Sequence, residues 1–391
     1  MPRILHLVPS YYPATYWGGP IYSTKAICDG VSALKDFQLR VLTTDASGPS
    51  VSDRVSVERN PLGFEEGYGV YYAKRIAGSS ISIEFINKLA SEIRWADLVH
   101  LTGTYSFPTL PAFVIARLAG KPLVWSPRGA LQASAEWPKG GRMYSKLAFE
   151  KVARWLVPPG TRMHVTSKEE AKLSMQRMPR LDASIIPNSV NLPENIPKRN
   201  WRPQSKVRLL FISRLHKKKG LEMLLEVMLR LPENFELYIY GTGEEEYVSS
   251  LEHYVMSNGL SKRVKFGGQV EGESKEQAFY EADIFLLPSY SENFGIVVAE
   301  ALGRGLPVIV SKSTPWSEVE KRGCGYWVKL GRSEFASAIV CMAGEDLEEM
   351  GTRGRQWMER EYSPVPIADR MVSLYHEVLT NQKTLKGEGQ L

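Results

Sequence analysis

Residues 289–302 read SYSENFGIVVAEAL, and this stretch decides the fold expected for the chain. The run ADIFLLP at residues 282–288 is apolar and ends in proline, which predicts a buried strand that stops there. Residues 296–302 lack a helix breaker, so they predict a helix that ends at Gly303 or Gly305. The order of strand, small polar loop and helix places loop amides at a helix N-terminus, where an anion is favoured.

Two carboxylates belong to this segment. Glu292 precedes the expected helix, and Glu300 lies inside it, eight residues further on. Eight helical residues rise roughly 12 Å, so the two side chains are able to contact opposite ends of one long ligand. A nucleotide sugar fits, with sugar hydroxyls at one end, a diphosphate in the middle and ribose hydroxyls at the other. Chance supplies such glutamate pairs in most chains of this length, so the prediction depends on the strand, loop and helix around them.

The longer segment PSYSENFGIVVAEALGRGLPVIVS, residues 288–311, resembles the donor-site signature of family 4 glycosyltransferases. These are retaining enzymes of the GT-B fold that need no metal. The resemblance extends from Ile4 to about Tyr362. It implies an α/β fold in which two Rossmann-like, doubly wound domains face a central cleft. It also implies a C-terminal helix that crosses back to the first domain.

Length and composition agree with two domains. A chain of 391 residues is too long for one ordinary core, and 43% apolar with 24% charged residues is typical of a soluble globular protein. We expect an acceptor-side domain at residues 1–195 and a donor-binding domain at residues 205–364. Residues 365–391 are expected to form the crossing helix. Residues 192–205 are rich in proline, asparagine and charge, which predicts the linker.

Cysteine usage and hydropathy indicate the compartment. Cys28, Cys324 and Cys341 have neither metal-ligand nor disulfide spacing, which argues for a reducing environment without a structural metal. No apolar stretch approaches the ~20 residues of a membrane span. We therefore expect a cytoplasmic protein. The formal charge of +6 agrees with a solvated basic surface, with phosphate-bearing ligands, or with an anionic membrane at the inner face of the plasma membrane.

The N-terminal part contains a glycine pair after the first expected strand. Gly18 and Gly19 follow that strand and precede Pro20, and paired glycines let a backbone approach a phosphate closely. The resemblance implies that this loop faces the donor diphosphate and the acceptor. A plain turn before a proline is the alternative.

His100 lies near the carboxyl end of a strand expected at residues 96–103, where ligands gather in open α/β sheets. It is able to bond a donor-sugar hydroxyl or the acceptor. A buried histidine satisfied by the backbone is an equal alternative. Many relatives carry histidine at the positions of Thr102 and Arg128, so this chain departs from the family there. Arg128 suits an anionic or phosphate-bearing acceptor instead.

The second domain begins with a strand at residues 208–213, a basic loop and a helix from Leu221, which together predict an anion site. In the family, the residues that match Arg214 and Lys219 grip the donor diphosphate. The loop residues that follow Glu292 are expected to bind the same substrate, and they are Asn293, Phe294 and Gly295.

Sugar transfer from a nucleotide sugar requires stabilisation of the departing diphosphate. The chain contains no Asp-X-Asp, so two cations, loop amides and a helix dipole are expected to replace a metal. No cofactor is expected, and the donor is of the UDP or GDP type. Glu292 would hold the transferred sugar and Glu300 the ribose. The catalytic candidates are Glu292, Arg214, Lys219 and His100.

Other functions remain open at this point. Gly241-Thr242-Gly243 follows a strand, but Glu246 stands where a dinucleotide fingerprint needs its third glycine, which argues against a dehydrogenase. A sugar epimerase or a decayed nucleotide-sugar-binding protein stays an alternative to the transferase. The expected acceptor is a glycan or a lipid-linked sugar in bacterial surface polysaccharide synthesis, and no nucleic acid is expected. Residues 137–158 mix basic and aromatic side chains, which suits a solvated helix or a helix on an anionic membrane.

Overall fold

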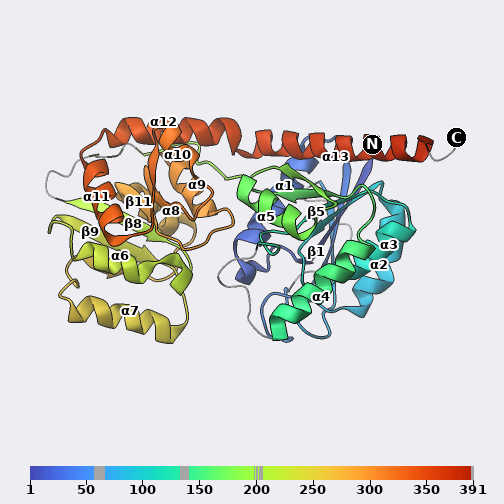
Figure 1. The fold of residues 1–391 in the computed structure, drawn as a ribbon, viewed down its shortest axis with the longest axis horizontal. Helices are drawn as coiled ribbons and strands as arrows, with labels where there is room; N and C mark the ends of the chain where they lie inside the picture. The colour runs from blue at the N-terminus through green and yellow to red at the C-terminus, as the bar shows by residue number, and fades with distance from the viewer. Residues whose placement is uncertain (57–66, 133–140, 198, 200, 202–205, 389–391) are drawn as a thin grey trace. The chain divides into compact units, whose positions relative to one another are not determined.

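The computed structural model describes residues 1–56, 67–132, 141–197, 199, 201 and 206–388, and it divides the chain into two compact units (Figure 1). Unit 1 contains residues 1–189 together with residues 364–391. Unit 2 contains residues 190–363. The last helix therefore belongs to the same unit as the N-terminus, as the sequence predicted for a returning C-terminal helix.

Unit 1 is built on a seven-stranded sheet in which every recorded strand pairing is parallel. The strand order is β3-β2-β1-β4-β5-β6-β7, which is the doubly wound order of a Rossmann-like domain. Its elements are β1 (Arg3–Ser10), η1 (Thr15–Trp17), α1 (Gly19–Ala33), β2 (Gln38–Thr44), β3 (Gly69–Ala73), α2 (Ile83–Trp95), β4 (Leu98–Thr102), α3 (Thr109–Leu118), β5 (Leu123–Ser126), α4 (Gly141–Leu156), β6 (Arg162–Val165), α5 (Lys168–Arg177), β7 (Asp182–Ile185) and α13 (Pro364–Glu388).

The two faces of this sheet bury different helices, because successive side chains of a strand point to opposite sides. Leu5 and Leu7 of β1 pack in the cluster that contains the apolar residues of α2 and α3. Ile4 and Val8 belong to a second cluster, with residues of α1 and α13 such as Met371. The alternation in β1 thus explains why the returning helix α13 has a face of the sheet to cover.

Unit 2 repeats the architecture with six strands in the order β10-β9-β8-β11-β12-β13, again with only parallel pairings recorded. One large cluster of buried side chains forms its core. The elements are β8 (Val207–Ile212), η2 (Lys217–Lys219), α6 (Leu221–Met228), β9 (Phe235–Tyr240), α7 (Glu245–Ser257), β10 (Val264–Phe266), α8 (Gly272–Glu281), β11 (Ile284–Leu287), α9 (Ile296–Gly303), β12 (Val308–Ser311), α10 (Glu318–Lys321), β13 (Gly325–Val328), α11 (Arg332–Ala343) and α12 (Leu347–Glu361).

Each sheet has one point at which the strand order reverses, and loops at such a point are where ligands bind in open α/β sheets. In unit 1 the reversal lies between β1 and β4, and in unit 2 it lies between β8 and β11. The loops that carry the expected site residues follow these strands or their neighbour β5. The fold prediction of two Rossmann-like domains is therefore confirmed.

Some element boundaries differ from the sequence prediction. Helical spacing predicts a first helix at residues 21–34, whereas α1 spans Gly19–Ala33, and the helix predicted at residues 221–231 ends at Met228. Trp137 and Lys139 of the basic, aromatic segment lie outside the described residues, as do residues 57–66 of the loop expected after β2. Within the described part of the chain, no helix is long and apolar enough to cross a bilayer.

Candidate active site

The loop after β8 carries the two cations that the sequence assigned to a diphosphate. Arg214 is exposed, and no described residue forms a hydrogen bond or an ion pair with its side chain. Lys219 ends η2, and the short helix is capped by His216, whose ring accepts a hydrogen bond from the Lys218 amide at 3.2 Å. One cation of this loop is therefore available to an incoming anion, whereas the other is placed by local structure.

Lys219 is buried and forms an ion pair inside unit 2. Its Nζ lies 2.5 Å from Oε2 of Glu292, and the same carboxylate oxygen accepts a hydrogen bond from the Ser289 hydroxyl at 3.3 Å. A lysine is rarely buried without a partner, so this pair explains how Lys219 is held there. Lys219 and Glu292 are 73 positions apart in the chain, and the structure brings them into contact. The sequence had assigned both residues to one site.

Two glycines allow the loops after β8 and β11 to meet. Gly220 has a φ of +72°, and a Cβ at this position would lie 2.2 Å from the carbonyl oxygen of Pro288. Gly295 has a φ of +73°, and its Cβ would lie 3.0 Å from Cγ of Glu292. A side chain at Gly220 would therefore separate the cationic loop from the loop that carries Glu292. The Tyr290 amide donates to the Lys218 carbonyl at 2.7 Å and ties the two loops together.

The N-terminus of α9 offers backbone donors, as the sequence predicted. The amides of Asn293, Phe294 and Gly295 have no protein acceptor among the described residues, and the first amides of a helix lack intrahelical partners. The Asn293 Oδ1 is buried without a hydrogen-bond partner. Asn293 directly follows Glu292, which is the partner of Lys219. The loop amides and the buried cation therefore lie close together at the start of α9.

Phe294 is expected to bind substrate as a residue of this loop, but its side chain lies away from that role. The ring is buried and packs against Trp316 at a centroid distance of 5.2 Å, and its carbonyl accepts a hydrogen bond from the Trp316 indole at 2.5 Å. Its side chain is part of the aromatic core of unit 2. The backbone amide is the part of Phe294 that stays available to a ligand.

Glu300 has a partner that the sequence analysis missed. Its Oε1 lies 2.7 Å from Nζ of Lys275, which comes from α8. No local motif marks Lys275, since it is one of several charged residues on a polar helix, and only the packing of α8 beside α9 reveals the contact. The two carboxylates of the signature are therefore each paired with a different lysine.

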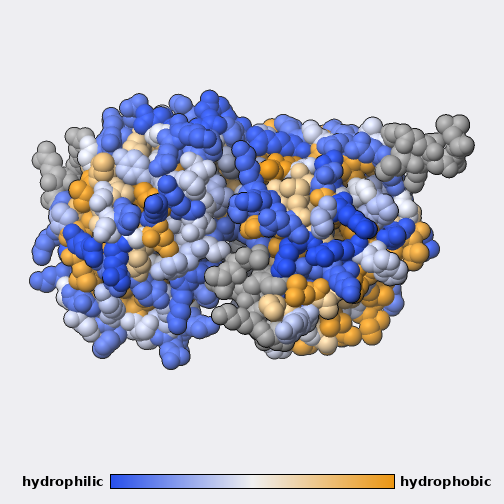
Figure 2. All heavy atoms as spheres, in the orientation of Figure 1, coloured by the Kyte–Doolittle hydropathy of each residue, from blue (hydrophilic) through white to orange (hydrophobic). Residues whose placement is uncertain are grey.

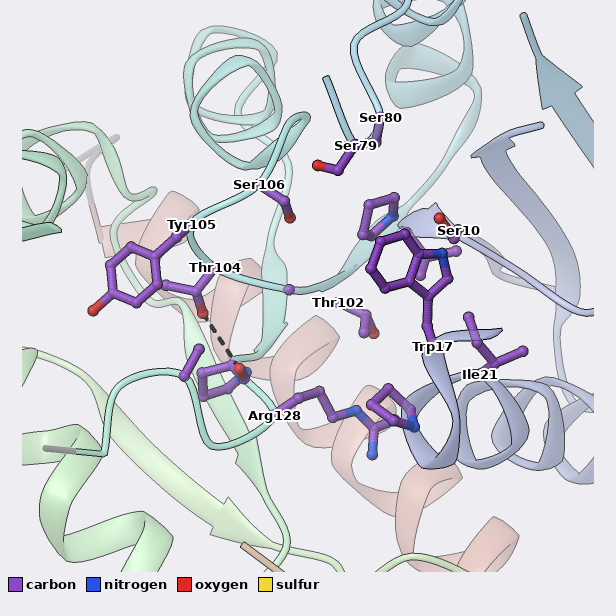
Figure 3. Close-up of a pocket in the computed structure, with 16 residues that line it drawn as sticks. Ser10, Trp17, Ile21, Ser79, Ser80, Thr102, Thr104, Tyr105, Ser106 and Arg128 are labelled. Atoms are coloured by element: carbon purple, nitrogen blue, oxygen red, sulfur yellow. Dashed lines mark hydrogen bonds between the residues drawn. The ribbon is translucent and has the colours of Figure 1, made fainter. Parts of the chain in front are cut away.

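Unit 1 contains a cavity of about 390 Å³ at the carboxyl ends of β1, β4 and β5 (Figure 3). Gly18 and Gly19 are not part of its lining, although their neighbours Trp17 and Pro20 are, and no atom lies within 4 Å of a Cβ at either glycine. The described lining residues are Val8, Pro9, Ser10, Trp17, Pro20, Ile21, Ser79, Ser80, Thr102, Gly103, Thr104, Tyr105, Ser106, Pro127, Arg128 and Ala130.

Arg128 is the charged residue of that lining. It follows β5 with a φ of +54°, and its Nη1 donates to Oδ1 of Asn188 at 2.7 Å. Its Nε and Nη2 are shielded from solvent and have no hydrogen-bond partner. Burial lowers the pKa of Arg128, while the charge of Glu170 acts in the opposite direction.

His100 belongs to a buried hydrogen-bonded chain rather than to the cavity. Its Nδ1 lies 2.6 Å from the Tyr375 hydroxyl of α13, and its Nε2 lies 2.7 Å from Oγ of Ser126. Ser126 in turn contacts Nδ1 of His164 at 2.7 Å, and Nε2 of His164 lies 3.0 Å from the Ile186 carbonyl. With its exposed fraction at 0%, His100 has no face toward a substrate, which contradicts the expectation of direct contact.

The Ile186 carbonyl fixes the direction of this chain because it can only accept. His164 therefore donates through Nε2 and accepts the Ser126 hydroxyl at Nδ1. Ser126 accepts from His100 Nε2, and His100 accepts the Tyr375 hydroxyl at Nδ1. All members are neutral in this arrangement, and the chain joins the sheet to the returning helix.

Burial keeps these histidines uncharged. Burial first, and then the charges of Arg128 and His164, lower the pKa of His6 to about 3. The pKa of His164 is also lowered to about 3, by burial and by Arg128. That of His100 is held well below its usual range by burial and by the neighbouring His6. His6 contacts the Thr102 hydroxyl at 2.8 Å and stacks on His100 at 4.2 Å, so the three rings form one cluster.

The comparisons with known proteins identify the family. The model of the family described as Glycosyl transferases group 1 matches residues 193–356, which include the cations, both glutamates and the amides of unit 2. This match covers the segment in which the sequence predicted the donor site. The recognition of the family from residues 288–311 is thereby confirmed.

Two curated relatives and one solved structure extend this result. A phosphatidyl-myo-inositol mannosyltransferase of Mycobacterium leprae is 31% identical to this chain. The aligned segment covers 51% of this chain and 55% of that relative. The chain thus spans about half the length of such curated relatives. A GDP-mannose:cellobiosyl-diphosphopolyprenol alpha-mannosyltransferase of Xanthomonas oryzae pv. oryzae is 24% identical, over 96% of this chain and 97% of its own. The Anabaena protein HepE, solved with UDP, has a TM-score of 0.71 at 18% identity over 96% and 100% of the two chains.

Proposed function

We propose that this protein is a glycosyltransferase that moves a sugar from a nucleotide-diphosphate sugar to a glycan or glycolipid acceptor. The observation that carries the proposal is the charge arrangement of unit 2. There the exposed Arg214 shares a loop with the buried Lys219, and Glu292, the partner of Lys219, directly precedes the amides of residues 293–295 at the start of α9. An anion with several oxygens matches this set of donors, and a diphosphate that departs from a sugar is such an anion.

Each residue has a distinct part in the proposed reaction. Arg214 and the loop amides bind the donor diphosphate, and Lys219 stabilises the charge that develops when the anomeric bond breaks. Glu292, already placed against Lys219, holds hydroxyls of the transferred sugar. Glu300 holds the ribose hydroxyls at the other end of the donor. Side-chain cations carry out the charge stabilisation in this proposal, so turnover needs no divalent metal.

The donor base and the acceptor are parts of the same proposal. HepE was solved with UDP, and the Xanthomonas relative is named for GDP-mannose and a diphosphopolyprenol-linked acceptor. These names support a UDP- or GDP-type donor and a lipid-linked acceptor. On the family resemblance we propose that this acceptor is used in surface polysaccharide synthesis. We further propose retention of anomeric configuration, as the family resemblance implies, and a cytoplasmic location, as the cysteine usage indicates.

The function is tested with a panel of UDP- and GDP-sugars in excess EDTA. Thermal shift identifies the donor that binds, and release of nucleoside diphosphate with and without candidate acceptors measures turnover. We expect one donor class to raise the melting temperature and to be consumed in the presence of chelator. Binding without turnover on any acceptor would favour a decayed binding protein. Conversion of the donor without transfer would favour an epimerase, and turnover that is lost with EDTA and restored by magnesium would contradict the metal-free mechanism.

A membrane contact is proposed for α4 of unit 1. Large apolar side chains are exposed on and beside this helix, among them Trp155 at 75% and Tyr144 at 68%, together with Leu118 of α3 at 83%. Figure 2 shows hydrophobic residues gathered on the part of the surface formed by unit 1, where Figure 1 places α2 to α4. Lys146 and Lys151 of α4 add positive charge. This combination suits an anionic bilayer surface.

Co-sedimentation with vesicles tests the membrane contact. The protein is expected to bind vesicles that contain anionic lipid and not neutral vesicles, and Trp155→Ala is expected to weaken the binding. Trp327 of unit 2, which is partly buried and donates its indole N–H to the Thr314 carbonyl, is the site of a matched control variant. Equal binding of Trp155→Ala and wild type would contradict the contact through α4.

A further inference from the structure

The cavity of unit 1 contains buried polar atoms that lack partners, and all of them are donors. They are the indole Nε1 of Trp17 and the Nε and Nη2 atoms of Arg128. A donor that is buried without an acceptor costs free energy, and the cost is greater for a charged group. No carboxylate belongs to the described lining. The ligand that would satisfy these atoms must therefore supply acceptors.

Arg128 presents one complete edge of its guanidinium group without a partner. The Nη1 atom is engaged by Asn188, which leaves the edge formed by Nε and Nη2. That edge carries two parallel N–H groups, and it matches the two oxygens of a phosphate or a carboxylate. Neither nitrogen touches solvent in this structure, so the proposed contact includes a turn of the side chain toward the cavity.

The neighbouring carboxylate does not neutralise Arg128. Glu170 accepts hydrogen bonds from the Thr166 amide and the Thr166 hydroxyl, each at 2.7 Å, and from the Gly129 amide. Its oxygens are thus committed to the backbone around β6 and to the loop that carries Arg128. Glu170 holds the loop in place, and it forms no ion pair with the guanidinium group among the described residues. Arg128 therefore has a carboxylate nearby but none in hydrogen-bonding contact among the described residues.

The backbone conformation at Arg128 supports a functional role. Its φ of +54° is unfavourable for a residue with a branched or long side chain, and such strain is concentrated at ligand sites. A glycine would adopt the conformation without strain. The chain instead carries its long cationic side chain at this point and directs it along the floor of the cavity, opposite the serines in Figure 3.

The opposite side of the cavity presents hydroxyl groups. Ser79, Ser80 and Ser106 gather there, and Ser10 lies near Trp17 (Figure 3). The Ser80 hydroxyl donates to the Phe107 carbonyl, whereas those of Ser79, Ser106 and Ser10 have no partner recorded among the described residues. Hydroxyls that both donate and accept suit the hydroxyl groups of a saccharide. The volume of about 390 Å³ falls in the range of roughly 300–1,000 Å³ that is usual for small-molecule sites.

We propose that this cavity binds an acceptor saccharide that carries an oxyanion, a phosphate or a carboxylate, with the oxyanion on Arg128 and Trp17 and the sugar hydroxyls on the serines. The term acceptor rests on the proposed function, whereas the recognition of an anionic sugar does not. A cationic sugar would meet Arg128 without a counter-charge. A neutral sugar would leave the guanidinium edge unsatisfied and would bind more weakly for that reason.

Binding of simple probes tests the proposal without turnover. Inorganic phosphate, glucose 1-phosphate, glucuronate and glucose are titrated calorimetrically at fixed ionic strength into wild type, Arg128→Gln and Lys219→Ala. We expect wild type to bind a charged sugar about tenfold to a hundredfold more tightly than glucose, because hydrogen bonds to charged groups are worth about 1.5–3 kcal/mol. The preference should disappear in Arg128→Gln. It should persist in Lys219→Ala, whose defect lies in unit 2.

Further variants make the outcome decisive. Trp17→Phe keeps the ring and removes the N–H, so it should weaken binding of the charged sugar by a smaller factor than Arg128→Gln. Arg128→Gln should melt at the wild-type temperature or above it, because a buried charge is removed. Equal affinity of wild type for charged and neutral sugars would overturn the proposal, as would a preference that survives in Arg128→Gln or vanishes in Lys219→Ala. A failed transfer assay beside a preserved charge preference would contradict the proposed function and leave this site standing.

Discussion

The binding loops of the two units lie at the same point of similar folds, but the cations at those loops have different partners. In unit 2 the buried cation is neutralised within the protein, since Lys219 lies 2.5 Å from Glu292 and Lys275 lies 2.7 Å from Glu300. In unit 1 Arg128 has an amide oxygen as its partner and no carboxylate among the described residues. An anion that binds Lys219 in unit 2 must therefore share the lysine with Glu292 or displace Glu292. An anion in unit 1 would bond to atoms of Arg128 that have no partner.

The units also differ in the burial of their histidines, although His376 of unit 1 is exposed. Unit 1 buries His6, His100 and His164 in one cluster, whereas His216 and His253 of unit 2 are exposed. A buried neutral histidine lowers the free energy of unfolding in acid, because it binds a proton in the unfolded chain but not in the folded one. The two units are therefore expected to differ in their stability at low pH as well as in ligand binding.

The largest expected effect is selective destabilisation of unit 1 by acid. Above pH 6.5 the histidines are neutral in both states, and stability does not depend on them. Between pH 6.5 and about 3, the unfolded chain is protonated while His6 and His164 stay neutral in the folded protein, so stability falls as the pH falls. The loss is roughly 4 kcal/mol at pH 5 relative to pH 8 for these two residues, by linkage.

Hydrogen exchange at pH 8 and pH 5, corrected for the intrinsic rate, measures this loss unit by unit. Amides of β1 and β4 should lose protection relative to those of β8 and β11. Equal loss of protection in both units would show that the histidine cluster does not distinguish them.

Lys219→Ala is expected to have the next largest effect. Lys219 meets the diphosphate most strongly when bond cleavage loads it with charge, so the variant should lower kcat as well as donor affinity. The loss of one such preorganised contact costs about 3 kcal/mol, on the order of a hundredfold in rate. Steady-state kinetics with saturating acceptor measure it, and Lys218→Ala, on the neighbouring residue of the same loop, is the control. A change in KM alone would contradict the role given to Lys219.

Arg214→Ala should have a smaller effect, because the side chain is exposed and its charge is screened by water. We expect both kcat and donor affinity to fall by about tenfold, the value of one moderate charge-assisted hydrogen bond. The same kinetic assay applies, repeated at two salt concentrations. A defect as large as that of Lys219→Ala at both concentrations would mean that the burial of the two cations does not determine their contributions.

Glu300→Gln should act on donor KM with little change in kcat, since ribose contacts hardly change during the reaction. An increase in KM by several-fold is expected, in line with the loss of one hydrogen bond to a charged group. Lys275→Ala is the matched variant, because it removes the partner and leaves the carboxylate. A reduced kcat in Glu300→Gln would indicate that the two ends of the donor are reversed.

The sequence predicted the parts of this molecule that depend on local pattern. The apolar runs predicted the strands, and residues 288–311 predicted the helix from Ile296 and the resemblance to the family. The anion site at the basic loop after β8 stays a prediction. The sequence did not predict contacts that depend on packing between elements. Lys275 sits on a polar helix without a motif, and His100 and Phe294 have the residue types of site residues although their surroundings are core. Their burial results from α13 and from Trp316, which lie 275 and 22 positions away in the chain.

The most direct test of the central claim is calorimetric titration of a nucleoside diphosphate, UDP or GDP according to the donor, into four proteins. These are wild type, Lys219→Ala, Arg214→Ala and Arg128→Gln. We expect both unit 2 variants to lose affinity, Lys219→Ala the more strongly, and Arg128→Gln to bind as wild type does. Nucleotide binding that is unaffected by the unit 2 variants, or that is abolished by Arg128→Gln, would contradict the assignment of the diphosphate to unit 2 and of the second anion to unit 1.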